Sequence, residues 1–318
     1  MPMKNFVRSV LFFLLTAVMI IYLANELQMH GLSDSSENSF FHQTPNSMDI
    51  LYIGNCHAYS SVKPTQIEEQ TGLHGYMLGA GNMDAELLYY YTKAALERQK
   101  PKYLVIEVFA YAVNQSYVSK ETIETSRREN IADLPFPYRA EIIKEELKRE
   151  DEHWVYDLLK IGFFHENWTE PEFFGKENVS EDSGWVSFGT NSIHYPDRIL
   201  QQDYQNDEMV MSDSDYSWFV RTIDLCREKN VYVILFAAPY YITDYETGIF
   251  NQIEEYALSN DIPFLNLTKN DMLESVSFYS KYMVDSRHVN KSGAEKVSEI
   301  LGDFIFSIIE CRRSNLNE

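Results

Sequence analysis

Cysteine is scarce in this 318-residue chain, and its three copies, Cys56, Cys226 and Cys311, lie far apart. There is no Cys-x-x-Cys motif, and no cysteine and histidine share the spacing of a zinc finger or a thiol-redox centre. The sequence therefore predicts no metal site and no cofactor, and it argues against a redox function. An odd number of cysteines also leaves at least one thiol unpaired.

Basic residues are also few, since 27 lysines and arginines face 48 aspartates and glutamates, a formal net charge of -21. Nucleic-acid binding needs clustered basic side chains, so we expect no nucleic-acid partner. The same charge disfavours adsorption to an anionic lipid surface. The hydrophobic content of 45% is sufficient for a sizeable buried core.

Charge is absent from residues 9–25, "SVLFFLLTAVMIIYLAN", which follow Lys4 and Arg8. A helix of this length covers most of a bilayer core of about 30 Å. We predict a transmembrane signal anchor over residues 6–25, with the basic end in the cytoplasm and the rest outside. The alternative is a cleaved signal peptide, but Tyr22 and Ala24 form a poor small-x-small cleavage site. We therefore expect a single-pass protein of the cell membrane with an extracytoplasmic domain.

The remaining chain divides by pattern. Residues 26–47 are polar and without periodicity, which is typical of a stalk, and residues 311–318 form a polar tail. Between them, residues 48–310 alternate short apolar runs such as "ILYIG" and "VYVILFAAP" with helical patterns. This alternation predicts an α/β/α sandwich around a mostly parallel sheet. A mainly helical insertion, about 114–213, interrupts it, and its aromatic residues either line a substrate cleft or pack against the core.

Candidate functional residues follow the predicted strands. Cys56 comes two residues after the glycine that ends "ILYIG", and Gly79, Gly81 and Asn82 follow the next strand. In parallel sheets, ligands bind beyond the carboxyl ends of the strands. We expect these residues to meet at that edge, together with the segment "DSRHVNKSGAEK" near the end of the chain.

That last segment places Asp285 and His288 three residues apart. A carboxylate at this spacing would hold Nδ1 of the imidazole, turning Nε2 toward a nucleophile. Cys56 is the candidate nucleophile, and backbone N–H groups near Cys56 and Gly81, with the Asn82 amide, would hold an oxyanion. The competing interpretations are that Cys56 is inert packing and that Asp285 and His288 form a salt bridge at a helix entrance.

The segments "ILYIGNCHAYSS", "YMLGAGNMDAELLYYYTKAAL", "QKPKYLVIEV" and "DSRHVNKSGAEKVSEIL" resemble successive blocks of the SGNH/GDSL hydrolase superfamily. They are most similar to its membrane-anchored bacterial branch, which includes the D-alanine transfer protein of teichoic acid decoration and alginate O-acetylation proteins. The resemblance covers about residues 49–113 and 213–309. It implies a flavodoxin-like fold, Cys56 in the place of the nucleophilic serine, Asp285 and His288 as orienting acid and base, and Gly79 or Gly81 as oxyanion glycine.

Two features depart from that pattern. The family's serine is a cysteine here, and the stretch after "YLVIEV", which reads "FAYAVN", has no Asn that matches the family's Gly-x-Asn block. A thioester passes its acyl group to a second acceptor more readily than an oxygen ester does, which would favour transfer over hydrolysis. We expect His57 to shape its loop without being a second base, and Glu107 to be a buried, hydrogen-bonded carboxylate.

The resemblance implies an extracytoplasmic acyl-ester hydrolase or acyltransferase acting on an acylated cell-envelope carbohydrate or polymer. Its partner would be a membrane-bound O-acyltransferase. The alternative is a catalytically degenerate SGNH-like scaffold that binds polysaccharide or such a membrane partner.

Overall fold

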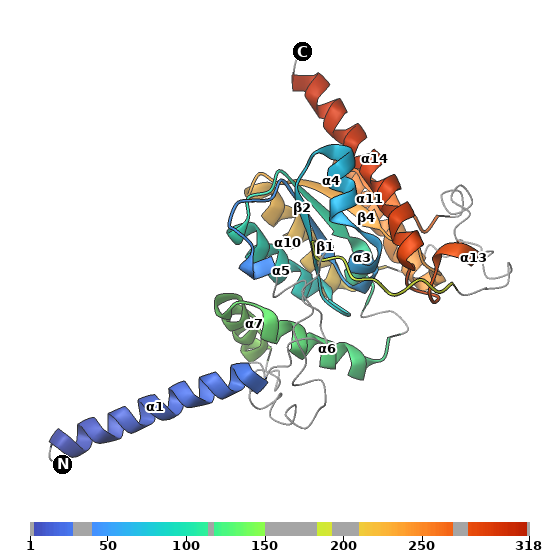
Figure 1. Ribbon diagram of the computed structural model, residues 1–318. Coiled ribbons are helices and arrows are strands. Elements are labelled where there is room, and N and C mark those ends of the chain that lie inside the picture. Colours follow the sequence, from blue (N-terminus) through green and yellow to red (C-terminus); the bar gives the residue numbers. More distant parts are fainter. Residues whose placement is uncertain are drawn as a thin grey trace. The chain divides into compact units, whose positions relative to one another are not determined.

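The computed structural model describes residues 3–27, 40–113, 118–149, 183–192, 210–269 and 279–316. The chain forms two compact units, one of residues 1–34 and 134–178 and the other of residues 35–133 and 179–318. The second unit holds the sheet and all candidate site residues (Figure 1). The aromatic residues of the insertion, for which both cleft lining and core packing were open, lie outside the described residues (Trp154, Phe163, Phe164, Trp168, Phe173 and Phe174).

The first unit contains two described helices, α1 (Met3–Leu27) and α7 (Phe136–Lys148). The stretch Met3–Ile20 of α1 has a mean hydropathy of 1.6 and is long and apolar enough to cross a membrane. A signal sequence has the same properties, so the choice between anchor and signal stays a prediction.

The second unit is built on five parallel strands: β1 (Ile50–Gly54), β2 (Gly75–Gly79), β3 (Tyr103–Glu107), β4 (Tyr232–Ala237) and β5 (Phe264–Asn266). Their order is β2-β1-β3-β4-β5, with every pair parallel. This is the flavodoxin-like order of doubly wound sheets. Gly54 pairs with Gly79, so β1 and β2 end side by side.

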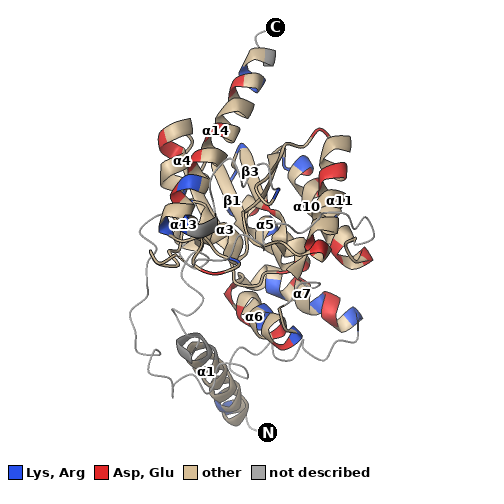
Figure 2. Ribbon diagram, turned by 90° about the vertical axis from the view of Figure 1, so that its right-hand side faces the viewer, with Lys and Arg blue, Asp and Glu red and all other residues tan. Residues whose placement is uncertain are grey.

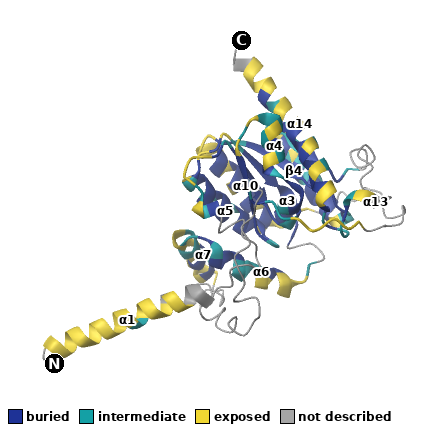
Figure 3. Ribbon diagram, in the orientation of Figure 1, coloured by how far each residue is buried: buried dark blue, intermediate teal, exposed yellow. Residues whose placement is uncertain are grey.

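The strands are buried almost throughout, as their continuous apolar runs predict for a sheet covered on both faces (Figure 3). On one face lie α3 (Cys56–Ser61), α4 (Pro64–Thr71) and the long α14 (Lys291–Leu316), which packs along α4. On the other lie α5 (Ala85–Arg98), α10 (Asp213–Glu228) and α11 (Asp244–Ser259) (Figure 2). The predicted three-layer α/β/α sandwich with a parallel sheet is confirmed.

Local sequence signals set the helix ends. Pro64 begins α4, and Gly72 ends it in the left-handed conformation, with φ of 70°. The Asp84 side chain caps α5 by accepting from the backbone N–H of Leu87, and Thr243 forms a capping box with Glu246 at the start of α11.

The polar stalk predicted over residues 26–47 is wrong for its last part, because residues 40–47 belong to the sheet unit. Phe40 is completely buried and its ring contacts that of Tyr76. The Gln99 side chain receives a hydrogen bond from the backbone N–H of Ser47 and donates one to the carbonyl of Thr44. The polar composition of this segment gave no sign of the buried Phe40 ring or of the hydrogen bonds between its backbone and the Gln99 side chain.

The ends of the predicted insertion also join the sheet unit. Helix α6 (Lys120–Asp133) packs on α5, where Arg127 makes ion pairs with Asp84 and Glu86. Residues 183–192 run beside the edge strand, since the N–H of Met77 in β2 donates to the carbonyl of Ser183. We call residues 183–192 the strap. At the other end of the domain, α14 continues to Leu316 through most of the predicted polar tail.

Candidate active site

The first site element is the turn that joins β1 to α3. Asn55 caps α3 through its side chain, which accepts from the backbone N–H of His57 at 3.1 Å. Cys56 is the first residue of that helix, and it is partly exposed. A side chain at Gly54 would lie 2.7 Å from the Cβ atoms of both Ala58 and Glu107, so only glycine fits. The turn therefore presents a thiol at the carboxyl edge of the sheet.

The second element is the loop before α14. The Asp285 carboxylate accepts the backbone N–H groups of Arg287 and His288, and its Oδ2 lies 2.9 Å from Nδ1 of His288. A bridge between Met283 and Val289 closes the loop. The carboxylate thus fixes both the loop backbone and the orientation of the imidazole.

The rest of that motif attaches the loop to the helix. Asn290 accepts from the backbone N–H of Gly293 through Oδ1 and donates to the carbonyl of Lys281 through Nδ2. A side chain at Gly293 would collide with the carbonyl of Tyr282. Asn290 and Gly293 therefore hold the position of His288 relative to α14.

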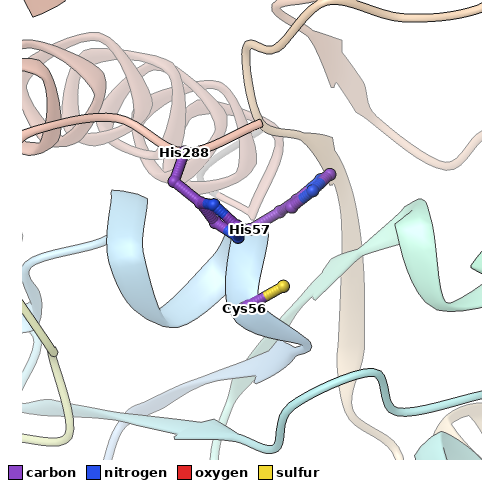
Figure 4. A group of neighbouring side chains, drawn as sticks. All are labelled: Cys56, His57 and His288. Carbon is purple, nitrogen blue, oxygen red and sulfur yellow. The ribbon is translucent and has the colours of Figure 1, made fainter. Parts of the chain in front are cut away.

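The two elements converge, although their residues are more than 200 positions apart. Cys56 Sγ and ring nitrogens of His57 and His288 all lie within 4.8 Å of one another (Figure 4). Burial by itself lowers the pKa of His288, but the hydrogen bond to Asp285 and the nearby Cys56 thiol raise it to about 9. The pKa of Asp285 is lowered despite partial burial, because His288 and the Arg287 N–H donate to it. This is a thiol, an imidazole and an orienting carboxylate in series.

Three features now coincide with the resemblance noted above: the strand order, a cysteine in the turn after the first strand, and an Asp-x-x-His pair in the loop before α14. The fold is SGNH-like.

Comparisons with known proteins give matches among solved structures only; no family model and no curated protein matches the chain. A lipolytic protein of the G-D-S-L family from Desulfitobacterium hafniense is 11% identical with a TM-score of 0.42, covering 80% of this chain and 97% of its own. A protein described as an acylhydrolase, from Bacteroides fragilis, is 11% identical with a TM-score of 0.40, covering 86% and 95%. A GDSL-like lipase from Bacteroides thetaiotaomicron is 14% identical with a TM-score of 0.39, covering 83% and 88%. These are likenesses of fold alone.

His57 lies in the same cluster as Cys56 and His288, which the sequence did not indicate. Its ring is 2% exposed, stacks on Phe109 with centroids 4.1 Å apart, and meets the His288 ring edge-on at 5.5 Å. Burial first, then the neighbouring His288 and Arg287 cations, lower the pKa of His57 well below its usual value. The sequence offered only one indication that His57 lies in this cluster, namely its position next to Cys56. Neighbouring residues of these types are too common for that to assign a role.

The predicted oxyanion residues lie on the neighbouring strand end. Gly79 is the last residue of β2, and Gly81 and Asn82 form the following turn, where Asn82 has φ of 48°. The Asn82 amide donates to Ser126 of α6, and the Gly81 carbonyl accepts from Asn130. These contacts anchor the turn to α6. Their participation in oxyanion binding stays a prediction.

Glu107 occupies the end of β3, where the SGNH pattern leads one to expect a nearby Asn. It is completely buried, and its Oε2 accepts from the backbone N–H of Phe109. Burial raises the pKa of Glu107 to about 8, although hydrogen bonds from the backbone of Phe109 and Ala238 oppose the rise. The expected buried, hydrogen-bonded carboxylate is confirmed.

The strap covers the other side of His288. Phe188 stacks on the imidazole of His288 and lies parallel to the ring of Tyr59. The backbone N–H of Val186 donates to the carbonyl of Tyr59, and the indole N–H of Trp185 donates to the carbonyl of Ser60. Part of the insertion therefore completes the site. The sequence shows that the insertion is rich in aromatic residues, but it does not indicate that Phe188 is the one that contacts His288.

The other two cysteines differ from Cys56. All three thiols are free. Cys226 is buried in α10, where burial raises its pKa to about 12, and Cys311 is exposed on α14. Cys56 alone combines partial exposure with a histidine oriented by a carboxylate.

Proposed function

We propose that this chain is an SGNH-type acyl-ester hydrolase or acyltransferase in which Cys56 is the nucleophile. The observation that carries the proposal is the placement of Cys56 Sγ within 4.8 Å of a ring nitrogen of His288 while Asp285 holds the other side of that ring. A nucleophile, a base and an orienting acid in this order are the parts needed for acyl transfer.

The reaction proceeds in two halves. The Cys56 sulfur attacks the carbonyl carbon of the acyl ester, the carbon–oxygen bond breaks, and the His288 imidazolium donates its proton to the departing alkoxide. This leaves a thioester on Cys56. A hydroxyl acceptor, either water or a sugar alcohol, then attacks the thioester, with His288 taking its proton and sulfur leaving as thiolate.

The oxyanion formed in each half needs donors close to Cys56. The backbone N–H of Cys56 makes no hydrogen bond within the described part of the chain, and it lies at the start of α3. Together with the backbone N–H of Gly81 and the Asn82 amide it supplies the proposed donors; one such donor contributes about 3 kcal/mol in other enzymes.

We further propose that the substrate is an acylated carbohydrate or polymer of the cell envelope and that the domain is extracytoplasmic. The support is the apolar helix α1, which carries Lys4 and Arg8 in its first turns, together with the resemblance stated above. A membrane-bound O-acyltransferase is the corresponding partner.

Mass spectrometry of the detergent-solubilised, chelator-treated chain tests the chemistry. After brief exposure to an activated acetyl ester, an acetyl adduct should appear on the peptide that contains Cys56. Cys56→Ala and His288→Ala should abolish ester turnover, and Cys56→Ser should retain part of it. Cys311→Ser removes an exposed thiol outside the site and is the matched control.

Turnover that persists in Cys56→Ala, or acetylation of Cys311 as fast as that of Cys56, would contradict the proposal. A complete lack of adduct would instead favour the non-catalytic scaffold.

A further inference from the structure

The proposed acyl-transfer mechanism leaves His57 unused, although it lies in the same cluster as Cys56 and His288. We propose that Cys56, His57 and His288 together bind one Zn²⁺ ion. The three side chains each offer one ligand atom, and these atoms lie within 4.8 Å of one another. Two segments contribute these side chains: the start of α3 carries Cys56 and His57, and the loop before α14 carries His288 (Figure 4).

Nδ1 of His57 is buried and has no hydrogen-bond partner among the described residues, whereas the ring of His288 already has the Cys56 thiol as a hydrogen-bond partner. An unsatisfied buried polar atom destabilises the folded state. A metal ion held between the rings would satisfy the nitrogen turned toward it. This is the second observation, independent of the clustering, that indicates a ligand.

The surroundings are also those of a metal site. Metal-binding histidines almost always donate their second N–H to a carboxylate or carbonyl, and Asp285 holds Nδ1 of His288 in this way. His57 is fixed by stacking on Phe109 and by contact with the Tyr240 ring. Burial keeps its imidazole neutral, which is the form that binds metals.

The donor set selects the kind of ion. One thiolate and two imidazoles suit Zn²⁺ and other late transition metals, whereas Mg²⁺ and Ca²⁺ require oxygen ligands. Tetrahedral zinc with bonds of about 2.0–2.3 Å places its ligand atoms roughly 3.4–3.6 Å apart. The present spread of up to 4.8 Å would have to shrink by no more than about 1.5 Å to reach this geometry.

If Cys56 is the nucleophile, as proposed above, zinc binding and acyl transfer exclude each other. The ion occupies the sulfur lone pair and the Nε2 of His288 that the reaction uses. Zinc would then hold the enzyme in an inactive state and protect the thiol from oxidation.

The direct test measures metal content and ligand type in the full chain. The detergent-solubilised protein is stripped with a chelator and equilibrated with Zn²⁺ or with Co²⁺ as a spectroscopic probe. We expect about one ion per chain, and an intense near-ultraviolet thiolate-to-Co²⁺ band that is absent in Cys56→Ser. His57→Gln, His57→Ala and His288→Ala should each weaken Zn²⁺ binding at least about tenfold, and Asp285→Asn by about 10- to 100-fold.

Matched controls separate this site from adventitious binding. Cys311→Ser removes the exposed thiol, and His74→Ala removes an exposed histidine that pairs with Glu68; both should bind Zn²⁺ like the wild type. The proposal is overturned if wild-type protein gives no thiolate-to-Co²⁺ band, if the band depends on Cys311, or if His57→Gln binds Zn²⁺ with unchanged affinity. The Co²⁺ measurement on the wild type needs no variant to fold.

The two proposals fail separately. Acetylation of Cys56 in metal-free protein without zinc binding would refute the metal site alone. Zinc binding without ester turnover in the metal-free protein would refute the enzyme alone.

Discussion

The ring of Phe188 lies flat on the imidazole of His288, with centroids 4.6 Å apart and planes inclined by 12°. An aromatic face attracts a cation, and such contacts contribute about 0.5–2 kcal/mol. Because His288 holds and releases the proton in the proposed mechanism, the strap contributes to that mechanism although none of its residues is a member of the proposed triad.

Replacing Phe188 with Ala should therefore lower the kcat/KM for an activated ester roughly two- to tenfold, and should lower the pKa of His288. Steady-state kinetics and a nuclear magnetic resonance titration of the metal-free protein measure these two effects. Phe306→Ala removes a half-exposed ring on α14 and should change neither. An unchanged His288 titration in Phe188→Ala would show that the stacking has no electrostatic role.

Asp285→Asn should lower the pKa of His288 from about 9 toward its ordinary value, because it removes the carboxylate that favours the imidazolium. In the wild type the raised pKa adds stability that is complete below about pH 6.5 and is lost as the pH rises through about 9. Urea unfolding of metal-free protein at pH 6 and pH 9.5 should show this loss. The Asp285→Asn variant should lose less stability between these two pH values. An equal pH dependence in both proteins would refute the claim that Asp285 raises the pKa of His288.

The effect of Glu107→Gln on the free energy of unfolding should change sign with pH. The folded state keeps Glu107 protonated up to about pH 8, whereas the unfolded state ionises near pH 4.5, so wild-type stability falls between these values. At about 1.4 kcal/mol per pKa unit the loss amounts to a few kcal/mol. The Gln variant carries no such loss and should exceed the wild type in unfolding free energy at pH 8, but not at pH 4.5. A variant less stable than the wild type at both pH values would contradict the expected burial cost.

Gly54→Ala should destabilise the domain by about 1–3 kcal/mol, because its new methyl group would meet two Cβ atoms that the backbone fixes. Gly81→Ala is the matched control for stability, since its methyl group would meet only the Tyr59 hydroxyl, at 3.9 Å. Thermal unfolding followed by circular dichroism compares the two. Equal melting temperatures would show that the turn before Cys56 can relax around a side chain.

The N-terminal helix should remain on the mature protein. The expected result is that the chain stays with membranes after alkaline extraction, and that mass spectrometry finds residues 3–20 intact. A mature N-terminus near residue 25 would instead identify a cleaved signal peptide.

The sequence by itself determined the strands and the layers, because short apolar runs such as Ile50–Gly54 alternate with helical patterns, as in a parallel sheet covered on both faces. It also determined the pairing of Asp285 with His288, since three residues of chain suffice to bring them together. The carboxyl-edge rule then indicated that Cys56 would meet them.

Only the tertiary structure decided what surrounds that pair. His57 and Phe188 enter the site through packing between segments far apart in the chain, and no local periodicity records such contacts. The docking of residues 40–47 was hidden for the same reason, because one buried ring and a few long-range hydrogen bonds outweigh a polar composition. Local pattern fixed the elements, and long-range burial fixed the surroundings of the thiol.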